Sequence, residues 1–201
     1  MTTMTNQNTA PGTGSPIVLV DMDGVFVNWG QGLNDRLLAR DPRYPIVPVG
    51  QQLDYDHLCG PGGDRTVLAE VMDSEGLYLN LEPLPGAVDA ILAMEEAGLD
   101  VFFCSTPFPT NPTCASEKLA SIERHLGLRW VSRTILTHDK TLVRGDVLID
   151  DHPGIIGAMK PAWRQLVFDQ SYNRNLVDAP RMTGWKHWEK AIFPMLEMAG
   201  V

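Results

Sequence analysis

Residues 17–25 read IVLVDMDGV, and this stretch decides the fold. The run Ile17–Val20 is short, apolar and β-branched, which is typical of a strand buried on both faces of a parallel sheet. Two carboxylates, Asp21 and Asp23, follow directly. Gly24 then frees the backbone to turn away and leaves the preceding side chain at the sheet edge. The sequence therefore predicts a first strand that carries acidic side chains to the carboxyl edge of a sheet.

Further apolar runs of the same kind recur along the chain and each closes on polar residues; they span 101–104, 134–136, 147–149 and 166–168. Segments with helical spacing lie between them and end at Gly98 and Gly127, which are natural helix stops. Alternating strands and helices predict an α/β fold, a doubly wound Rossmann-like parallel sheet with helices on both faces.

The stretch from 31 to 80 interrupts this alternation. It is rich in Pro, Gly and Asp, with a helix expected near 66–72 and no convincing strand. We expect a small, mainly helical cap inserted after the first strand, because structureless loops of this length are uncommon in compact domains; a long disordered loop is the alternative. The expected organisation is a disordered tail at 1–15, a Rossmann-like core at 16–30 and 81–201, and a cap at 31–80.

The composition limits which classes of protein this chain can belong to. A chain of 201 residues with 44% hydrophobic residues has room for one core, and its net charge of −9 argues against a nucleic acid polymer or an anionic membrane surface as partner. The three cysteines show no paired spacing, and neither a signal peptide nor a membrane span is apparent. These features favour a cytoplasmic protein; the oligomeric state stays open, with a homodimer among the options.

Polar clusters follow four of the expected strands, and in a doubly wound sheet such positions converge on one crevice. The clusters are Asp21 and Asp23, then Ser105 and Thr106, then His138, Asp139 and Lys140, then Asp150 and Asp151. For a single Asp at a strand end, a turn or helix cap is an equally good interpretation. Four acids on two strands instead favour a shared hard cation, and an all-oxygen site suits Mg²⁺.

The remaining polar clusters have the chemistry of a phosphate site. Ser105 and Thr106 offer hydroxyls and backbone amides for phosphate oxygens, although a plain turn is the other interpretation. Lys140 can neutralise both a carboxylate nucleophile and a bound phosphate, unless it is an ordinary surface lysine.

With these residues in place the sequence resembles the haloacid dehalogenase superfamily of phosphohydrolases. The resemblance rests on DMDGV at 21–25, a Ser or Thr that ends the next core strand, a downstream Lys, and IDD at 149–151. More narrowly it resembles the 5'(3')-deoxyribonucleotidases, through VLVDMDGV, LEPLPGAV at 81–88, DVFFCSTP at 100–107, ILTHDKT at 135–141 and VLIDDHP at 147–153.

The resemblance implies a mechanism. Asp21 would be the nucleophile, and Asp23 would protonate the leaving oxygen and later activate water. Magnesium would be held by an Asp21 carboxylate oxygen, the Asp23 carbonyl and Asp151, with Asp150 orienting neighbours. Alternation of side chains along a strand also suggests that only one acid of that pair ligates directly. The phosphate-binding positions of the family correspond to Ser105, Thr106 and Lys140.

Two departures from the family pattern concern the substrate. The stretch 51–57, where the family carries cap aromatics, offers only Tyr55, and His138 stands where an Arg is expected. The expected function is hydrolysis of (deoxy)ribonucleoside monophosphates with Mg²⁺. The alternatives are a phosphatase of another small metabolite such as a sugar phosphate, a silent nucleotide or metal binder, or transfer to an acceptor other than water.

Overall fold

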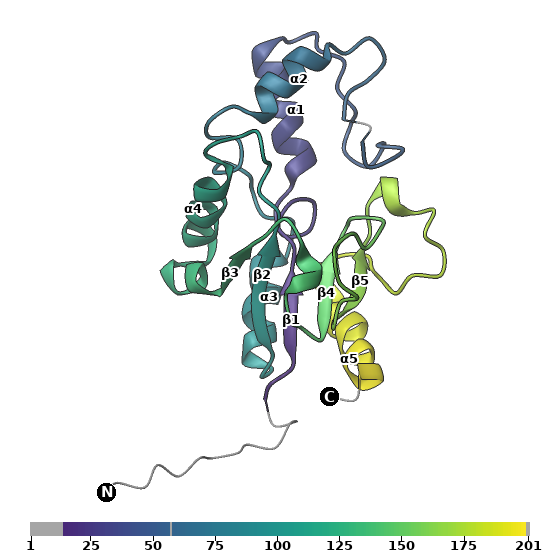
Figure 1. The fold of residues 1–201 in the computed structure, drawn as a ribbon. Coiled ribbons are helices and arrows are strands. Elements are labelled where there is room, and N and C mark those ends of the chain that lie inside the picture. Colours follow the sequence, from purple (N-terminus) through teal and green to yellow (C-terminus); the bar gives the residue numbers. More distant parts are fainter. Residues whose placement is uncertain (1–13, 57, 200–201) are drawn as a thin grey trace, which may run out of the picture.

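The computed structural model describes residues 14–56 and 58–199. Its centre is a parallel sheet in the order β3-β2-β1-β4-β5-β6 (Figure 1). The strands are β1 (Ile17–Val20), β2 (Asp100–Ser105), β3 (Thr134–Leu136), β4 (Val147–Asp150), β5 (Arg164–Phe168) and β6 (Arg181–Met182). The predicted parallel α/β sheet is confirmed, and β6 is a strand that the sequence analysis missed because it is only two residues long.

The first strand is central, as its apolar character requires. β1 pairs with β2 on one side and with β4 on the other. Its side chains alternate between the two faces: Val18 and Val20 belong to the large core cluster, whereas Leu19 packs on the opposite face. Both faces are buried, so the strand reads as a continuous apolar run.

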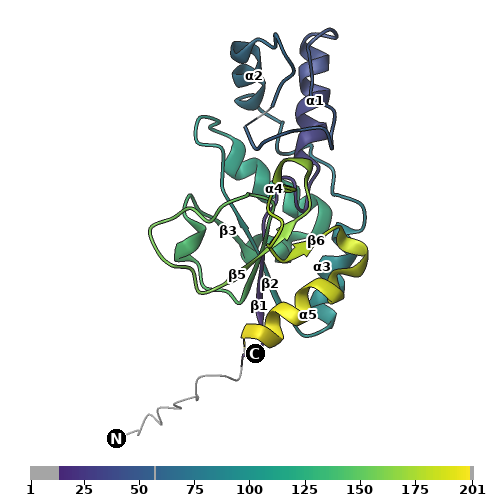
Figure 2. The same cartoon turned by 90° about the vertical axis from the view of Figure 1, so that its right-hand side faces the viewer.

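Long helices cover one face of the sheet. They are α3 (Ala87–Glu96), α4 (Cys114–Leu126) and α5 (Trp188–Ala199), whose buried Ile91, Ile122 and Ile192 join one core cluster. Figure 2 shows α3 and α5 on the same side of the sheet. The predicted helix ends are confirmed, since α3 stops just before Gly98 and α4 is capped by Gly127.

The opposite face departs from the expected cover of helices. A smaller cluster of Leu19, Cys104, Leu148 and Trp163 lies there, beside the 3-10 turn Lys140–Leu142. The connection from β4 to β5 at 151–163 is rich in Gly and Pro, which disfavour a helix interior, and it crosses this face without forming one. The site described below is therefore bordered on this side by loops.

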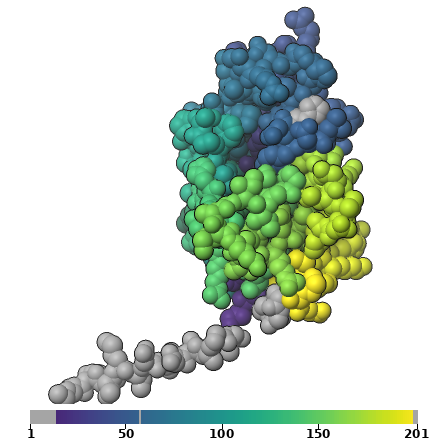
Figure 3. All heavy atoms as spheres, turned by 45° about the vertical axis from the view of Figure 1, so that its right-hand side comes forward, coloured from purple at the N-terminus to yellow at the C-terminus, as the bar shows by residue number. Residues whose placement is uncertain are grey.

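The segment between β1 and α3 forms two helices, α1 (Trp29–Arg40) and α2 (Arg65–Met72), which pack on each other above the carboxyl ends of the strands (Figure 1). They share a core cluster of their own with Leu33, Leu37, Leu68 and Val71. Figure 3 shows the blue atoms of this segment stacked over the green atoms of the sheet-bearing part. The helix expected near 66–72 is confirmed.

Helix α1 was not expected. Gly30 and Gly32 lower its intrinsic helix propensity, which hid the signal. The helix starts because the Asn28 side chain caps it by accepting from the Gln31 N–H at 3.2 Å, and it is held by the buried Leu33 and Leu37. A side chain at position 32 would collide with Leu81, so the glycine allows close packing rather than flexibility.

The expected disordered tail at 1–15 lies almost entirely outside the described residues. Within 14–56 and 58–199, no helix combines the length and hydropathy needed to cross a membrane.

Candidate active site

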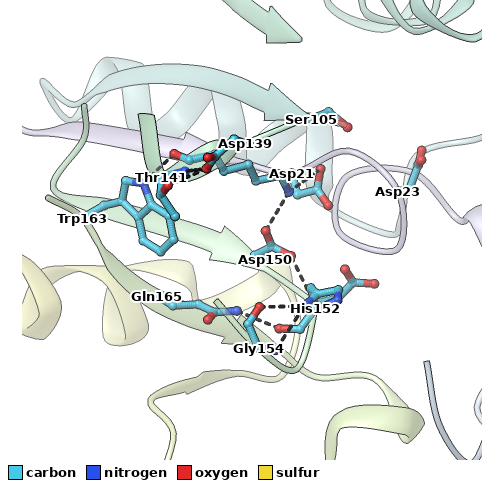
Figure 4. A network of polar contacts seen from close by, with 12 residues as sticks. Asp21, Asp23, Ser105, Asp139, Thr141, Asp150, His152, Gly154, Trp163 and Gln165 are labelled. Atoms are coloured by element: carbon cyan, nitrogen blue, oxygen red, sulfur yellow. Dashed lines mark hydrogen bonds and ion pairs between the residues drawn. The ribbon is translucent and has the colours of Figure 1, made fainter. Parts of the chain in front are cut away.

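The polar clusters predicted from the sequence meet at the carboxyl edge of the sheet. Figure 4 shows Asp21, Asp23, Ser105 and Asp150 converging there from three different strand ends. Asp21 continues the β1 pairing by donating its backbone N–H to the Ile149 carbonyl at 2.9 Å. The convergence follows from parallel strands, whose carboxyl ends share one edge.

A tight loop after β1 positions Asp23. The Met22 carbonyl accepts the backbone N–H groups of Val25, Phe26 and Val27 at 2.9–3.3 Å, so the chain wraps back on itself. Gly24 takes the left-handed conformation with φ of 73°, and a Cβ at this position would collide with the Asp151 carboxylate. A glycine is needed here for conformation and for space together.

Three carboxylates form a candidate metal site. One oxygen each from Asp21, Asp150 and Asp151 lies within 4.8 Å of the others, and all three residues are buried. Burial is the main cause that raises the pKa of Asp151 well above its ordinary value, followed by the charges of Asp150 and Asp21. Clustered buried carboxylates fit a hard divalent cation, which would relieve this repulsion and accept only oxygen ligands.

The two acids of the IDD stretch do not diverge as strand alternation suggested. β4 ends at Asp150, so Asp151 lies beyond the last paired residue and its side chain turns into the same cluster. Asp150 accepts from Lys140 at 2.6 Å and from the His152 backbone N–H at 2.9 Å. Asp151 instead accepts from the Tyr172 hydroxyl.

Lys140 sits between two of these acids. Its Nζ lies 3.0 Å from Asp21 Oδ1 and 2.6 Å from Asp150 Oδ2, with a side chain 14% exposed. Burial acts to lower its pKa, but the two carboxylates outweigh burial and raise it, so the ammonium is charged. The interpretation of Lys140 as an ordinary surface lysine is wrong.

The turn that carries Lys140 is held from several sides (Figure 4). Asp139 caps it by accepting the Thr141 backbone N–H at 2.9 Å and also accepts the Ala158 N–H at 2.8 Å. Trp163 donates its indole N–H to the Lys140 carbonyl at 3.1 Å. These contacts fix the backbone from which the lysine reaches the acids.

The sequence analysis missed a second buried lysine, Lys118 on α4. Its side chain is 1% exposed and its Nζ donates to Asp23 Oδ2 at 2.6 Å and to Ser105 Oγ at 3.0 Å. The pKa of Asp23 is raised, mainly by burial and further by the charge of Asp21, whereas the charge of Lys118 acts to lower it. Helical spacing around this lysine carried no signal for a site.

Sequence analysis also missed Tyr172 and Asn173, which lie in the short 3-10 helix Ser171–Asn173 after β5, and Gln170, which caps it. Gln170 donates to the Gly24 carbonyl at 2.5 Å, and Asn173 donates to the Asp151 carbonyl at 2.8 Å. This segment therefore ties both acid-bearing loops together.

Two cavities open onto this centre. One, of about 290 Å³, lies between α1 and the sheet edge and is lined by Trp29, Tyr78 and Phe108 among others, with Asp23 at its base. The other, of about 310 Å³, contains Asp21, Lys140, His138 and His152. Asp23, Tyr55 and the exposed Thr106 line both cavities. Every site residue predicted from the sequence therefore lies in or beside these cavities or in the carboxylate cluster.

Comparison with known proteins agrees with this geometry. The model of the family described as 5' nucleotidase, deoxy (pyrimidine), cytosolic type C matches residues 15–197. The human cytosolic-type 5'(3')-deoxyribonucleotidase is 37% identical, with 87% of this chain and 92% of that protein covered. The mouse mitochondrial 5'(3')-deoxyribonucleotidase is 36% identical, with 87% and 84% covered.

A solved structure shares the fold at low sequence identity. The HAD family hydrolase of Deinococcus radiodurans R1, with bound phosphate and sodium, has a TM-score of 0.53 and 17% identity, with 94% of this chain and 98% of that chain covered. The resemblance expected from the sequence motifs is confirmed. The chain belongs to the family of 5' nucleotidases, deoxy (pyrimidine), cytosolic type C.

Proposed function

We propose that this protein is a magnesium-dependent phosphomonoester hydrolase that dephosphorylates deoxyribonucleoside monophosphates through a phospho-aspartate on Asp21. The observation that carries the proposal is the meeting of Asp21, Asp150 and Asp151 within 4.8 Å, with Lys140 Nζ 3.0 Å from Asp21. Family membership and relatives named 5'(3')-deoxyribonucleotidase support the substrate class.

The residues of the chain divide the work of phosphoryl transfer. The Asp21 carboxylate attacks phosphorus, and the bond from phosphorus to the ester oxygen breaks while Asp23 gives that oxygen its proton. Asp23, now ionised, takes a proton from water as the water oxygen attacks phosphorus. Inorganic phosphate leaves, Asp21 is restored and Asp23 is protonated again, so all atoms balance.

Asp23 has the surroundings that these proton transfers need. It lines the cavity beside α1, and burial raises the pKa of its carboxyl, which favours the protonated form required for the first step. The Asp23 side chain is 28% exposed and lines this cavity, so a ligand bound there can reach it. Ser105, Thr106 and Lys140 would bind the phosphate oxygens.

Magnesium would be held by Asp21, Asp151 and the Asp23 carbonyl. When bound, it supplies positive charge that offsets the phosphate and the carboxylates. The buried all-oxygen donor set supports this choice of metal.

The segment 31–80 would serve as the cap, with the leaving nucleoside in the cavity beneath α1. Apolar and aromatic side chains dominate this cavity, which suits a base and sugar. Tyr55 reaches from this segment to the core, with ring centroids 4.6 Å from His152 and 5.7 Å from Tyr172. A cytoplasmic location is part of the proposal, supported by the cytosolic-type relative.

A panel of phosphomonoesters assayed with Mg²⁺ tests the proposal. We expect deoxyribonucleoside monophosphates to be the best substrates and Asp21→Asn to abolish phosphate release without loss of the folded state. Hydrolysis of sugar phosphates without hydrolysis of any nucleotide would replace the proposed substrate class by sugar phosphates. Negligible activity of both the wild type and Asp21→Asn would favour a catalytically silent binder.

A further inference from the structure

Lys118 is an unusual lysine because its ammonium has no route to solvent. The residue lies in the first half of α4 with a side chain 1% exposed. Its Nζ donates to Asp23 Oδ2 at 2.6 Å and to Ser105 Oγ at 3.0 Å, and it lies 5.4 Å from the centroid of the Tyr78 ring. Two of its three N–H donors therefore have acceptors, and the Tyr78 ring adds a cation–π contact.

The helix that carries Lys118 is fastened at the neighbouring residue. Glu117 is buried and accepts the backbone N–H groups of Gly76 and Tyr78 at 2.6 and 3.0 Å. The same residue thus fixes the turn that bears the Tyr78 ring. The lysine and its aromatic neighbour are consequently held in place before any substrate binds.

The two oxygens of Asp23 are in different situations. Oδ2 is held by Lys118, whereas Oδ1 is buried and has no hydrogen-bond partner among the described residues. A carboxylate that is hydrogen-bonded at one oxygen cannot rotate freely, so the whole group keeps a defined orientation. Lys140 holds Asp21 and Asp150 instead, so each of the two catalytic acids has a lysine of its own.

We propose that Lys118 is a positioning residue that holds the Asp23 carboxyl in one orientation toward the reacting oxygen, rather than a ligand of the substrate phosphate. The inference rests on the proposed function of this site. Because a misplacement of about 1 Å can cost about 100-fold in rate, loss of Lys118 should be felt in turnover. It should leave binding of the phosphate group nearly unchanged.

The test compares leaving groups. Lys118→Met keeps the length of the side chain without its donors, and Lys118→Arg keeps the charge. Lys190→Met, at an exposed position of α5, is the matched control. We expect Lys118→Met to lower kcat for a deoxyribonucleoside monophosphate about 100-fold with KM within about twofold, and Lys118→Arg to recover part of it. The nitrophenolate burst from p-nitrophenyl phosphate should fall far less, since nitrophenolate leaves without a proton.

A double mutant gives an independent measurement. Adding Lys118→Met to Asp23→Asn should cost less than about threefold more, because the group that Lys118 positions is already inactive. Circular dichroism checks the folding of each variant, and Lys118→Gln replaces Lys118→Met if the latter does not fold.

Three results would overturn the inference: a tenfold rise in KM and in the inhibition constant of inorganic phosphate with kcat preserved, equal losses for both leaving groups, or full additivity with Asp23→Asn. Each of these results is compared with the wild-type enzyme, which must itself hydrolyse the nucleotide. A wild type without nucleotide turnover would instead remove the proposed function itself.

Discussion

Glu117 fastens the return of the inserted segment to the core. The residue is 6% exposed, and its carboxylate accepts four hydrogen bonds. Oε1 accepts from the Gly76 N–H and the Thr113 hydroxyl, both at 2.6 Å, and Oε2 accepts from the Tyr78 and Leu79 N–H groups at 3.0 and 3.2 Å. Burial acts to raise the pKa of this carboxyl, but these hydrogen bonds outweigh burial and lower it below its ordinary value.

The variant Glu117→Gln keeps the shape and removes the charge. Its amide NH₂ must occupy the place of one oxygen, so at least one backbone N–H of residues 76–79 loses its acceptor. An unsatisfied buried donor costs about 1–3 kcal/mol, and the remaining bonds lose their charge assistance. We expect the free energy of unfolding to fall by about 3 kcal/mol, which for a chain of this length lowers Tm by about 6–12 °C.

The pH dependence gives a second check on the same variant. Because the folded-state pKa of Glu117 is lowered, its stabilisation is complete above the unfolded pKa of about 4.3 and is lost as pH falls through the folded pKa. Glutamine does not titrate, so the difference in Tm between the two proteins is largest at neutral pH and shrinks below about pH 4.

Thermal unfolding followed by circular dichroism from neutral pH to about pH 3.5 measures both effects. Glu123→Gln, at an exposed position of the same helix, is the control and should change stability by less than about 0.5 kcal/mol. A loss below about 1 kcal/mol at neutral pH, or a difference that grows on acidification, would refute the reasoning.

Three further predictions concern the site and the core. Gly24→Ala should lower kcat at least about tenfold in a phosphate-release assay by displacing Asp151, whereas Gly98→Ala, with a similar positive φ but no atom nearby, should cost only about 1–2 kcal/mol of stability in thermal unfolding. Without metal, in the presence of a chelator, Asp151→Asn should have the same Tm as the wild type or a higher one, because the substitution removes a buried carboxylate that is repelled by its neighbours. Mg²⁺ should raise the Tm of the wild type but not that of the variant. An equal rise in both proteins would show that Asp151 does not bind the metal. Trp185→Phe should cost about 1–3 kcal/mol in urea unfolding, since the buried indole N–H donates to the Val25 carbonyl at 2.9 Å, and a neutral result would contradict that role.

Local patterns sufficed for the sheet and for the acids at its edge. A strand buried on both faces must be a short continuous apolar run, so Ile17–Val20 and Thr134–Leu136 were predicted with the bounds that the structure has. Asp21, Asp23, Asp150 and Lys140 were found because parallel strands bring their carboxyl ends to one edge. The parallel direction of the strands is enough to place these side chains at one edge.

The tertiary structure alone decided which helix faces meet the site. Lys118 lies 95 residues from Asp23 in sequence, and only the packing of α4 against β2 and the loop after β1 joins them. Helix α1 was hidden because its stability comes from packing with α2, while its glycines lower local propensity. Propensity and periodicity report what a segment does by itself, but a buried lysine or a glycine against Leu81 is set by what the rest of the chain places beside it.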